Sequence, residues 1–170
     1  NRRPQCGGLL AEDETAYDAL GRSLAAGRGF VMDQGWLYTR PGEQTAYANF
    51  LYPAFVGAVY WGTRESVLAL TLVQVLLGAL AVVGVSAAAA RLGGAPAGTW
   101  AGVLAAVHPG LALSSVMVMT EALAVPLLVG AALTWMRFLE RPGWVRGGMV
   151  GVACAAACLT RSQALYALPA

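Results

Sequence analysis

Two long runs without a charged side chain constrain the fold of this chain more than any other feature. Residues 66–90 form a run of 25, and residues 92–120 form a run of 29. A helix needs about 20 consecutive apolar residues to cross the core of a bilayer, so either run is long enough. Two shorter apolar runs follow at 122–136 and 147–160. The pattern predicts an all-α, polytopic membrane protein.

The charge balance of the chain points away from nucleic acid. Charged residues make up 12% of the sequence, whereas soluble domains average about 25%. The 11 basic residues are all arginines and exceed the 9 acidic residues by a net charge of +2. They are scattered, whereas nucleic-acid-binding proteins cluster basic residues on one face or helix. We expect membrane lipid around the chain and no nucleic-acid partner.

The first 65 residues are too polar to cross a membrane, and we assign residues 1–65 to one long loop. Within it, residues 13–27 predict a helix with Asp13 as N-cap and Gly27 as its end. Its apolar face is predicted to consist of Ala16, Tyr17, Leu20 and Leu24. Residues 49–62 are apolar and aromatic but too short to span, which is typical of an interfacial helix.

Residues 66–170 are predicted to form a transmembrane bundle. We place its four spans at 66–90, 98–116, 118–138 and 147–168. The sequence "ARLGGAPAG" predicts a tight turn between the first two spans, and "HPG" at 108–110 predicts a kink or a helix end. Because the chain starts without methionine and stops inside an apolar stretch, we expect it to be an N-terminal fragment of one larger domain.

The arginines in the short loops predict the orientation of the bundle. Four of them fall on the same side of the predicted membrane: Arg91, Arg137, Arg141 and Arg146. Short loops rich in arginine usually face the cytoplasm, so this side is predicted to be cytoplasmic. The long first loop, Glu121 and Arg161 are then predicted to face outward.

Charged residues at this outer face are the candidates for a functional site. An ionisable side chain within a span costs about 2.5–3.5 kcal/mol, so Glu121 and Arg161 are expected to pair or to line a wet cavity. A pair that only fixes packing is one interpretation. The acidic run at Glu12, Asp13 and Glu14 is either a solvated helix start or part of a site. Arginine suits a phosphate, and a carboxylate suits proton removal from a hydroxyl.

Five stretches of the sequence, in order, resemble one known family. They are "EDETAYDALGRSLAAGRGF", "TAYANFLYPAFVGAVY", "LVQVLLGAL", "VHPGLALSSVMVMTEAL" and "GVACAAACLTRSQALYALP". Together they resemble the C-type (GT-C) membrane glycosyltransferases, in particular the bacterial group that is protein-mannosyltransferase-like and aminoarabinose-transferase-like. The first stretch resembles the first extracytoplasmic loop of that family, and the likeness covers nearly the whole chain.

The resemblance implies a multi-pass enzyme of the plasma membrane and cell envelope, with its active site on the extracytoplasmic side. Such enzymes transfer a sugar from a polyprenyl-phosphate donor to a lipid, glycan or protein acceptor, with inversion. It implies that Asp13 is the catalytic general base or an acceptor-positioning group, and that Glu14 is its catalytic companion, near a metal or the acceptor. It also implies that Tyr17, Glu121 and Arg161 bind substrate, with Arg161 against the donor phosphate. The cofactor stays open, with a divalent metal as one option.

The sequence departs from the pattern of this family at two places, and two alternative functions stay open. Ser162 stands where the family usually has proline, and Asn49-Phe50 replaces an arginine–proline pair. These departures point to a different acceptor or to a different local backbone. Glu12 and Asp18 are expected to be ordinary solvated charges. A transporter would also place charges within membrane helices, although nearer to mid-membrane. A non-catalytic membrane assembly protein would use the same charges only for pairing.

Overall fold

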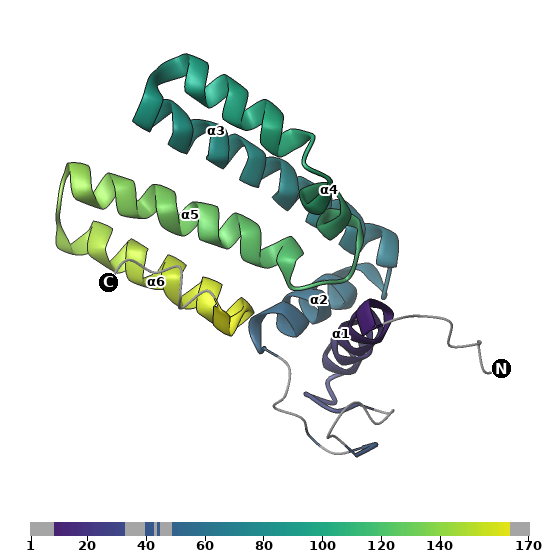
Figure 1. The fold of residues 1–170 in the computed structure, drawn as a ribbon. Helices are drawn as coiled ribbons and strands as arrows, with labels where there is room; N and C mark the ends of the chain where they lie inside the picture. Colours follow the sequence, from purple (N-terminus) through teal and green to yellow (C-terminus); the bar gives the residue numbers. More distant parts are fainter. Residues whose placement is uncertain (1–8, 33–39, 43, 45–48, 164–170) are drawn as a thin grey trace.

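The computed structural model describes residues 9–32, 40–42, 44 and 49–163, and these form an all-α fold (Figure 1). The described residues contain six helices and one isolated bridge between Val31 and Gln44. The helices are α1 (Leu9–Ala25), α2 (Leu51–Thr63), α3 (Val67–Ala106), α4 (Pro109–Val116), α5 (Glu121–Glu140) and α6 (Trp144–Thr160). The predicted fold class is confirmed.

Helix α3 is a hairpin of two helical arms. Gly94, at φ 80° and ψ 178°, reverses the chain between the arms, in a conformation that glycine adopts without steric cost. The Ser86 hydroxyl on the first arm donates to the Gly98 carbonyl on the second, at 2.9 Å. A Cβ on Gly98 would lie 2.6 Å from the Cβ of Ala90. Small residues therefore let the two arms touch, as in closely packed membrane helices.

The remaining helices are arranged around α5. Helix α5 packs against both α3 and α6, and α1 packs against α2 across one end of these long helices (Figure 1). Glycine allows the close contact between α1 and α2, because a Cβ on Gly57 would lie 2.8 Å from the Leu24 Cβ. The main core lies at this end and consists of Tyr52, Val56, Tyr60, Leu70, Val118, Ala122 and Leu123.

Helix α1 begins earlier than the sequence predicts. It starts at Leu9, so Asp13 lies inside the helix and the prediction of an N-cap at Asp13 is wrong. The acidic residues continue the helix, since glutamate is a good helix former and nothing at 9–12 breaks it. The C-terminal end agrees with the sequence, because α1 ends at Ala25 and Gly27, two residues later, has a positive φ of 74°.

The later helices also differ from the predicted spans. The predicted 98–116 segment is interrupted at His108, whose extended backbone (φ −69°, ψ 117°) is the conformation that a following proline favours. Helix α5 begins at Glu121, and α6 runs from Trp144 to Thr160. Arg161 therefore lies directly after a helix and not within one. Residues 164–168 of the last predicted span lie outside the described residues.

Two of the described helices, α3 and α5, are long and apolar enough to cross a membrane, and α6 is apolar but shorter. Large apolar side chains are exposed along them, for example Leu76, Leu80 and Leu104. Helix α2, predicted to be interfacial, buries one face that includes Tyr52, whereas Trp61 is 80% exposed.

Candidate functional site

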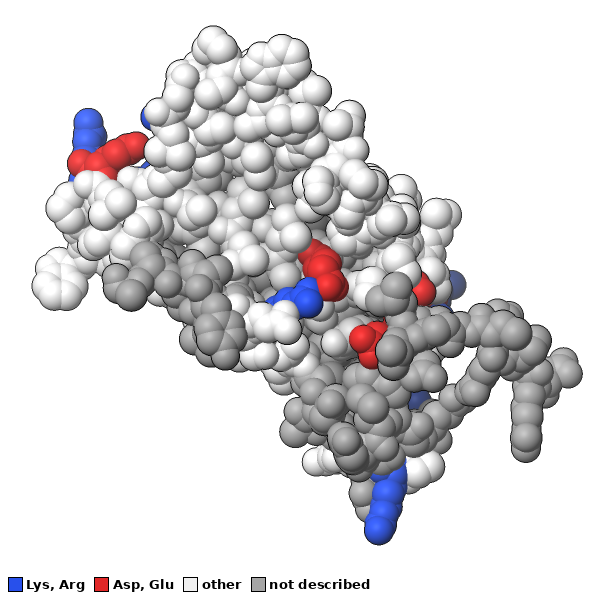
Figure 2. All heavy atoms as spheres, viewed as in Figure 1, with Lys and Arg blue, Asp and Glu red and all other residues white. Residues whose placement is uncertain are grey.

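Four parts of the chain that are far apart in sequence meet at one small cleft. The cleft has a volume of about 210 Å³ and lies between α1, Asn49 just before α2, the segment that leads into α5, and the residues that follow α6. Its lining consists of Asp13, Tyr17, Asn49, Met119, Thr120, Glu121, Arg161, Ser162 and Gln163. On the face shown in Figure 2, a small group of acidic and basic side chains lies near the middle of a largely uncharged surface. Four of the five predicted site residues line this cleft.

Arg161 and Glu121 form an ion pair within the cleft. The Arg161 Nη1 donates to Glu121 Oε1, and both side chains are partly exposed, at 38% and 35%. Arg161 Nε donates to Gln163 Oε1 at 2.6 Å, and the Thr120 hydroxyl donates to Glu121 Oε2 at 3.2 Å. These bonds fix the guanidinium and use only part of its five N–H donors. Arg161 is thus oriented and still able to bind an anion.

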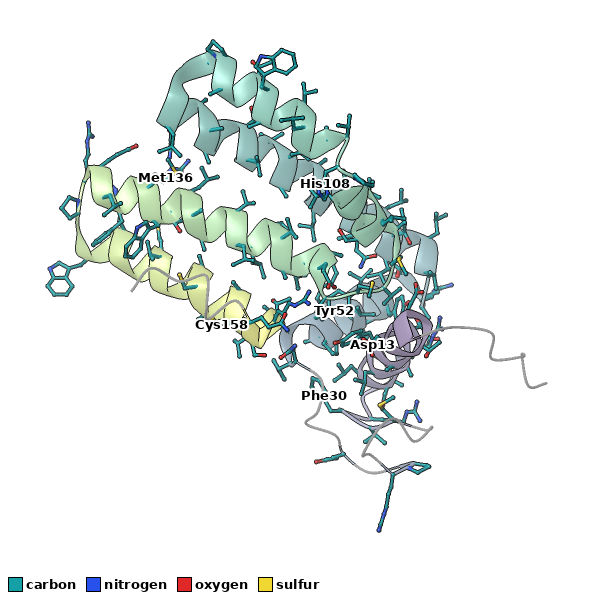
Figure 3. All side chains as sticks on the ribbon, viewed as in Figure 1. Asp13, Phe30, Tyr52, His108, Met136 and Cys158 are labelled. Carbon is teal, nitrogen blue, oxygen red and sulfur yellow. The ribbon has the colours of Figure 1, made fainter. Side chains whose placement is uncertain are left out.

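Asp13 and Tyr17 line the cleft from the side of α1. Figure 3 shows Asp13 on α1 at the end of the molecule that also holds Tyr52 and Cys158, far from Met136. The Asp13 carboxylate contributes to the wall of the cleft, where it can accept a hydrogen bond from a bound group. Tyr17 packs edge-on against Tyr52, with ring centroids 5.2 Å apart.

The pKa of Tyr17 is shifted by burial and by the charges around it. Burial raises the pKa of Tyr17, the carboxylates of Asp13 and Glu121 raise it further, and the Arg161 guanidinium lowers it. An ionised carboxylate disfavours a phenolate nearby, whereas a cation favours it. The four side chains therefore share one electrostatic environment, although they come from three separate segments.

Glu14, the fifth predicted site residue, lies elsewhere. Its Oε1 accepts a hydrogen bond at 3.1 Å from the backbone N–H of Val118, between α4 and α5. Glu14 is not among the residues that line the cleft. The structure therefore places Glu14 beside the backbone that leads to Glu121.

An apolar groove lies next to the cleft. It has a volume of about 590 Å³ and lies between α3, α4 and α5. Its lining includes Val75, Val82, Leu111 and Pro126. Glu121 borders both the groove and the cleft, so the polar and apolar spaces adjoin at this residue.

The sequence did not predict a charged network that joins α1 to the end of α2 and the residue Glu65 after it. Asp18, expected to be a solvated charge, accepts hydrogen bonds from the Tyr60 hydroxyl at 2.5 Å and from Arg22 Nε at 2.9 Å. Arg22 also pairs with Glu65 at 2.6 Å and lies 5.1 Å from the centre of the Tyr60 ring. The spacing of Asp18 and Arg22, four residues apart on one helix, is the signal that could have revealed the network.

The two departures from the family pattern both fall on the cleft, because Asn49 and Ser162 contribute to its lining.

No group of three or more histidine, cysteine or acidic side chains suited to a metal ion occurs in the part of the chain that the structure describes.

Comparison with known proteins identifies the class. Residues 51–170 match the family of dolichyl-phosphate-mannose-protein mannosyltransferases. The match covers more than two thirds of the chain, from α2 to its end, and includes Glu121 and Arg161. Neither a curated protein nor a solved structure matches the chain. The protein is a membrane glycosyltransferase of the GT-C type, and the chain belongs to the dolichyl-phosphate-mannose-protein mannosyltransferase family.

Proposed function

We propose that this protein transfers a sugar from a polyprenyl-phosphate donor to an acceptor hydroxyl or amine, with inversion. The observation that carries the proposal is the convergence of a carboxylate, Asp13, with an oriented cation, Arg161, on one cleft. We also propose that the protein crosses the plasma membrane several times and that the cleft faces the extracytoplasmic side. The arginine-rich turn between α5 and α6, at the opposite end, supports that orientation.

The donor is proposed to bind between Arg161 and the apolar groove. The Arg161 guanidinium would bind the donor phosphate, since it keeps its charge when desolvated and offers paired N–H donors. As the bond from the sugar to the phosphate oxygen breaks, negative charge develops on the phosphate, and a cation already in place lowers the barrier. Glu121 holds Arg161 in position, and the groove beside Glu121 would accept the first isoprenoid units.

The acceptor is proposed to react against Asp13. Its oxygen or nitrogen would attack the anomeric carbon from the face opposite the phosphate, and its proton would pass to the Asp13 carboxylate. The polyprenyl phosphate would leave with the electron pair of the broken bond, next to Arg161. Tyr17 would position the acceptor, because its ring is held edge-on against Tyr52 at the wall of the cleft.

A pair of carboxylate variants of the complete protein tests this proposal. We expect Asp13→Asn to lower sugar transfer by about 100-fold or more at unchanged protein level, since general-base catalysis contributes 10²–10⁴-fold. Glu140→Gln is the matched control, because Glu140 is an exposed carboxylate at the end of α5 opposite Glu121. The assay measures transfer of labelled sugar from a polyprenyl-phosphate donor in membranes. Equal transfer by both variants would refute the role of Asp13.

A further inference from the structure

One peptide group between α4 and α5 is held by side chains on both of its sides. Its carbonyl, on Met117, accepts a hydrogen bond from Gln74 Nε2 at 3.4 Å. Its N–H, on Val118, donates to Glu14 Oε1 at 3.1 Å. Gln74 belongs to α3 and Glu14 to α1, so two separate helices fix a single unit of backbone.

Gln74 is an unusual residue in its surroundings. It is a fully buried amide within the long apolar run of α3, and its Nε2 also donates to the Tyr52 hydroxyl at 2.8 Å. Its Oε1 has no hydrogen-bond partner among the described residues, which makes its burial costly. A buried polar group that is only partly satisfied needs a structural reason. Holding the Met117 carbonyl together with Tyr52 supplies that reason.

The fixed peptide group leads directly into the cleft. Val118 is 5% exposed and packs in the main core, and the next residues, Met119 and Thr120, line the cleft. Thr120 then bonds to Glu121, which orients Arg161. A displacement of the peptide group would therefore be transmitted through three residues of backbone to the ion pair.

The bond between Glu14 and Val118 also connects the two sides of the cleft, the one that carries Asp13 and the one that carries Glu121. Glu14 follows Asp13 directly on α1, so its bond to Val118 joins the helix that carries the carboxylate to the backbone that carries Glu121. We propose that Glu14 is a positioning residue and that it acts with Gln74. Together they set the distance between Asp13 and the Glu121–Arg161 pair. This inference rests on the proposed function of the cleft.

A positioning role and a chemical role for Glu14 predict different variants. Glutamine at position 14 keeps an acceptor oxygen for the Val118 N–H, whereas alanine removes it. In the complete protein in membranes, we expect Glu14→Gln to retain transfer within about 5-fold and Glu14→Ala to lower it about 10- to 100-fold, since small misplacements of reacting groups have effects of this size. If Glu14→Gln is as inactive as Glu14→Ala, the carboxylate acts chemically and the proposal is wrong.

Gln74 provides a second test, because it lies outside the cleft. We expect Gln74→Leu, which replaces the amide with an apolar side chain of similar size, to lower transfer about 10-fold. The double variant Glu14→Ala/Gln74→Leu is expected to transfer about as slowly as Glu14→Ala alone, since both changes release the same peptide group. The proposal would be overturned if Gln74→Leu transferred sugar at the wild-type rate. It would also be overturned if the fold-loss of the double variant equalled the product of the two single losses.

Hydrogen exchange gives a readout that does not depend on activity. We expect the Val118 amide to exchange at least 10-fold faster in Glu14→Ala than in the wild type, and Glu14→Gln to restore slow exchange. Asp13→Asn should leave this amide unchanged. Unaltered exchange in Glu14→Ala would refute the contact itself. If the wild-type protein itself transfers no sugar, faster exchange in Glu14→Ala would refute the proposed function and leave the contact in place.

Discussion

The pairing of Arg161 with Glu121 leads to a prediction that separates catalysis from packing. Replacing Arg161 with methionine removes the guanidinium and keeps much of the apolar stem. The side chains are 38% and 35% exposed, so solvent screens their attraction. Partly exposed ion pairs contribute up to about 1 kcal/mol, which corresponds to a loss of at most a few degrees in Tm.

The expected effect of Arg161→Met on catalysis is much larger. A cation placed against charge that develops in the transition state contributes about 2.7–4 kcal/mol, or 10²–10³ in rate. We therefore expect transfer to fall at least 100-fold while the Tm falls by only a few degrees. Glu121→Gln, which keeps an acceptor for Arg161, is expected to lower transfer about 10-fold with a similar small loss of Tm.

The assay combines transfer from a polyprenyl-phosphate donor with thermal unfolding of the complete protein in lipid nanodiscs. If the pair only fixes packing, Arg161→Met will lose activity in proportion to folded protein, and the surviving folded fraction will transfer sugar at the wild-type rate. That result would refute the assignment of Arg161 to the donor phosphate.

Three further predictions concern the packing of α1 on α2. Arg22→Met should lower the Tm by a few degrees, because Arg22 bridges Asp18 and Glu65 at 2.9 and 2.6 Å. If Arg22→Met has the same Tm as the wild type at low salt, this prediction is wrong. Burial raises the pKa of Tyr60, and its hydrogen bond to the carboxylate of Asp18 raises it further. The folded state therefore favours the neutral phenol, so its stabilising effect is complete below the unfolded pKa of about 10 and is lost as the pH rises above it. Between about pH 8 and 11, the Tm should fall less in Tyr60→Phe than in the wild type. If the Tm falls equally with pH in both proteins, Tyr60 does not contribute to the pH dependence of stability. Gly57→Ala should destabilise by about 1–3 kcal/mol, because its Cβ would lie 2.8 Å from that of Leu24. In Gly62→Ala, where nothing lies within 4 Å, the Tm should be unchanged or higher; equal shifts in both would argue against close packing.

The sequence was sufficient to predict an all-α chain and the regions that form its helices, although not their exact bounds. Runs of apolar residues identify the helical regions, and the glycines near residues 27 and 94 mark where the chain must turn. Counting crossings predicted that Asp13, Glu121 and Arg161 lie on one face, and the structure brings them to one cleft. These features depend on local composition and on simple connectivity.

Other features depend on packing between distant segments. The bond from Glu14 to Val118 joins residues 104 positions apart, on α1 and between α4 and α5, so it depends on tertiary packing. The approach of α1 to α2 likewise places Asp18 beside Tyr60 and gives it a partner that its sequence neighbourhood does not show. The start of α1 was misplaced, because an acidic residue near a helix start fits an N-cap and a first turn equally well.

Following the fate of a polyprenyl-phosphate sugar donor tests whether the cleft catalyses sugar transfer. Purified complete protein is supplied with a polyprenyl-phosphate-linked labelled sugar and an acceptor extract, and both products are quantified. We expect one polyprenyl phosphate released per sugar transferred, an inverted anomeric configuration in the product, and loss of both in Asp13→Asn. Donor consumption without transfer, retention of configuration, or unchanged turnover in Asp13→Asn would contradict this mechanism.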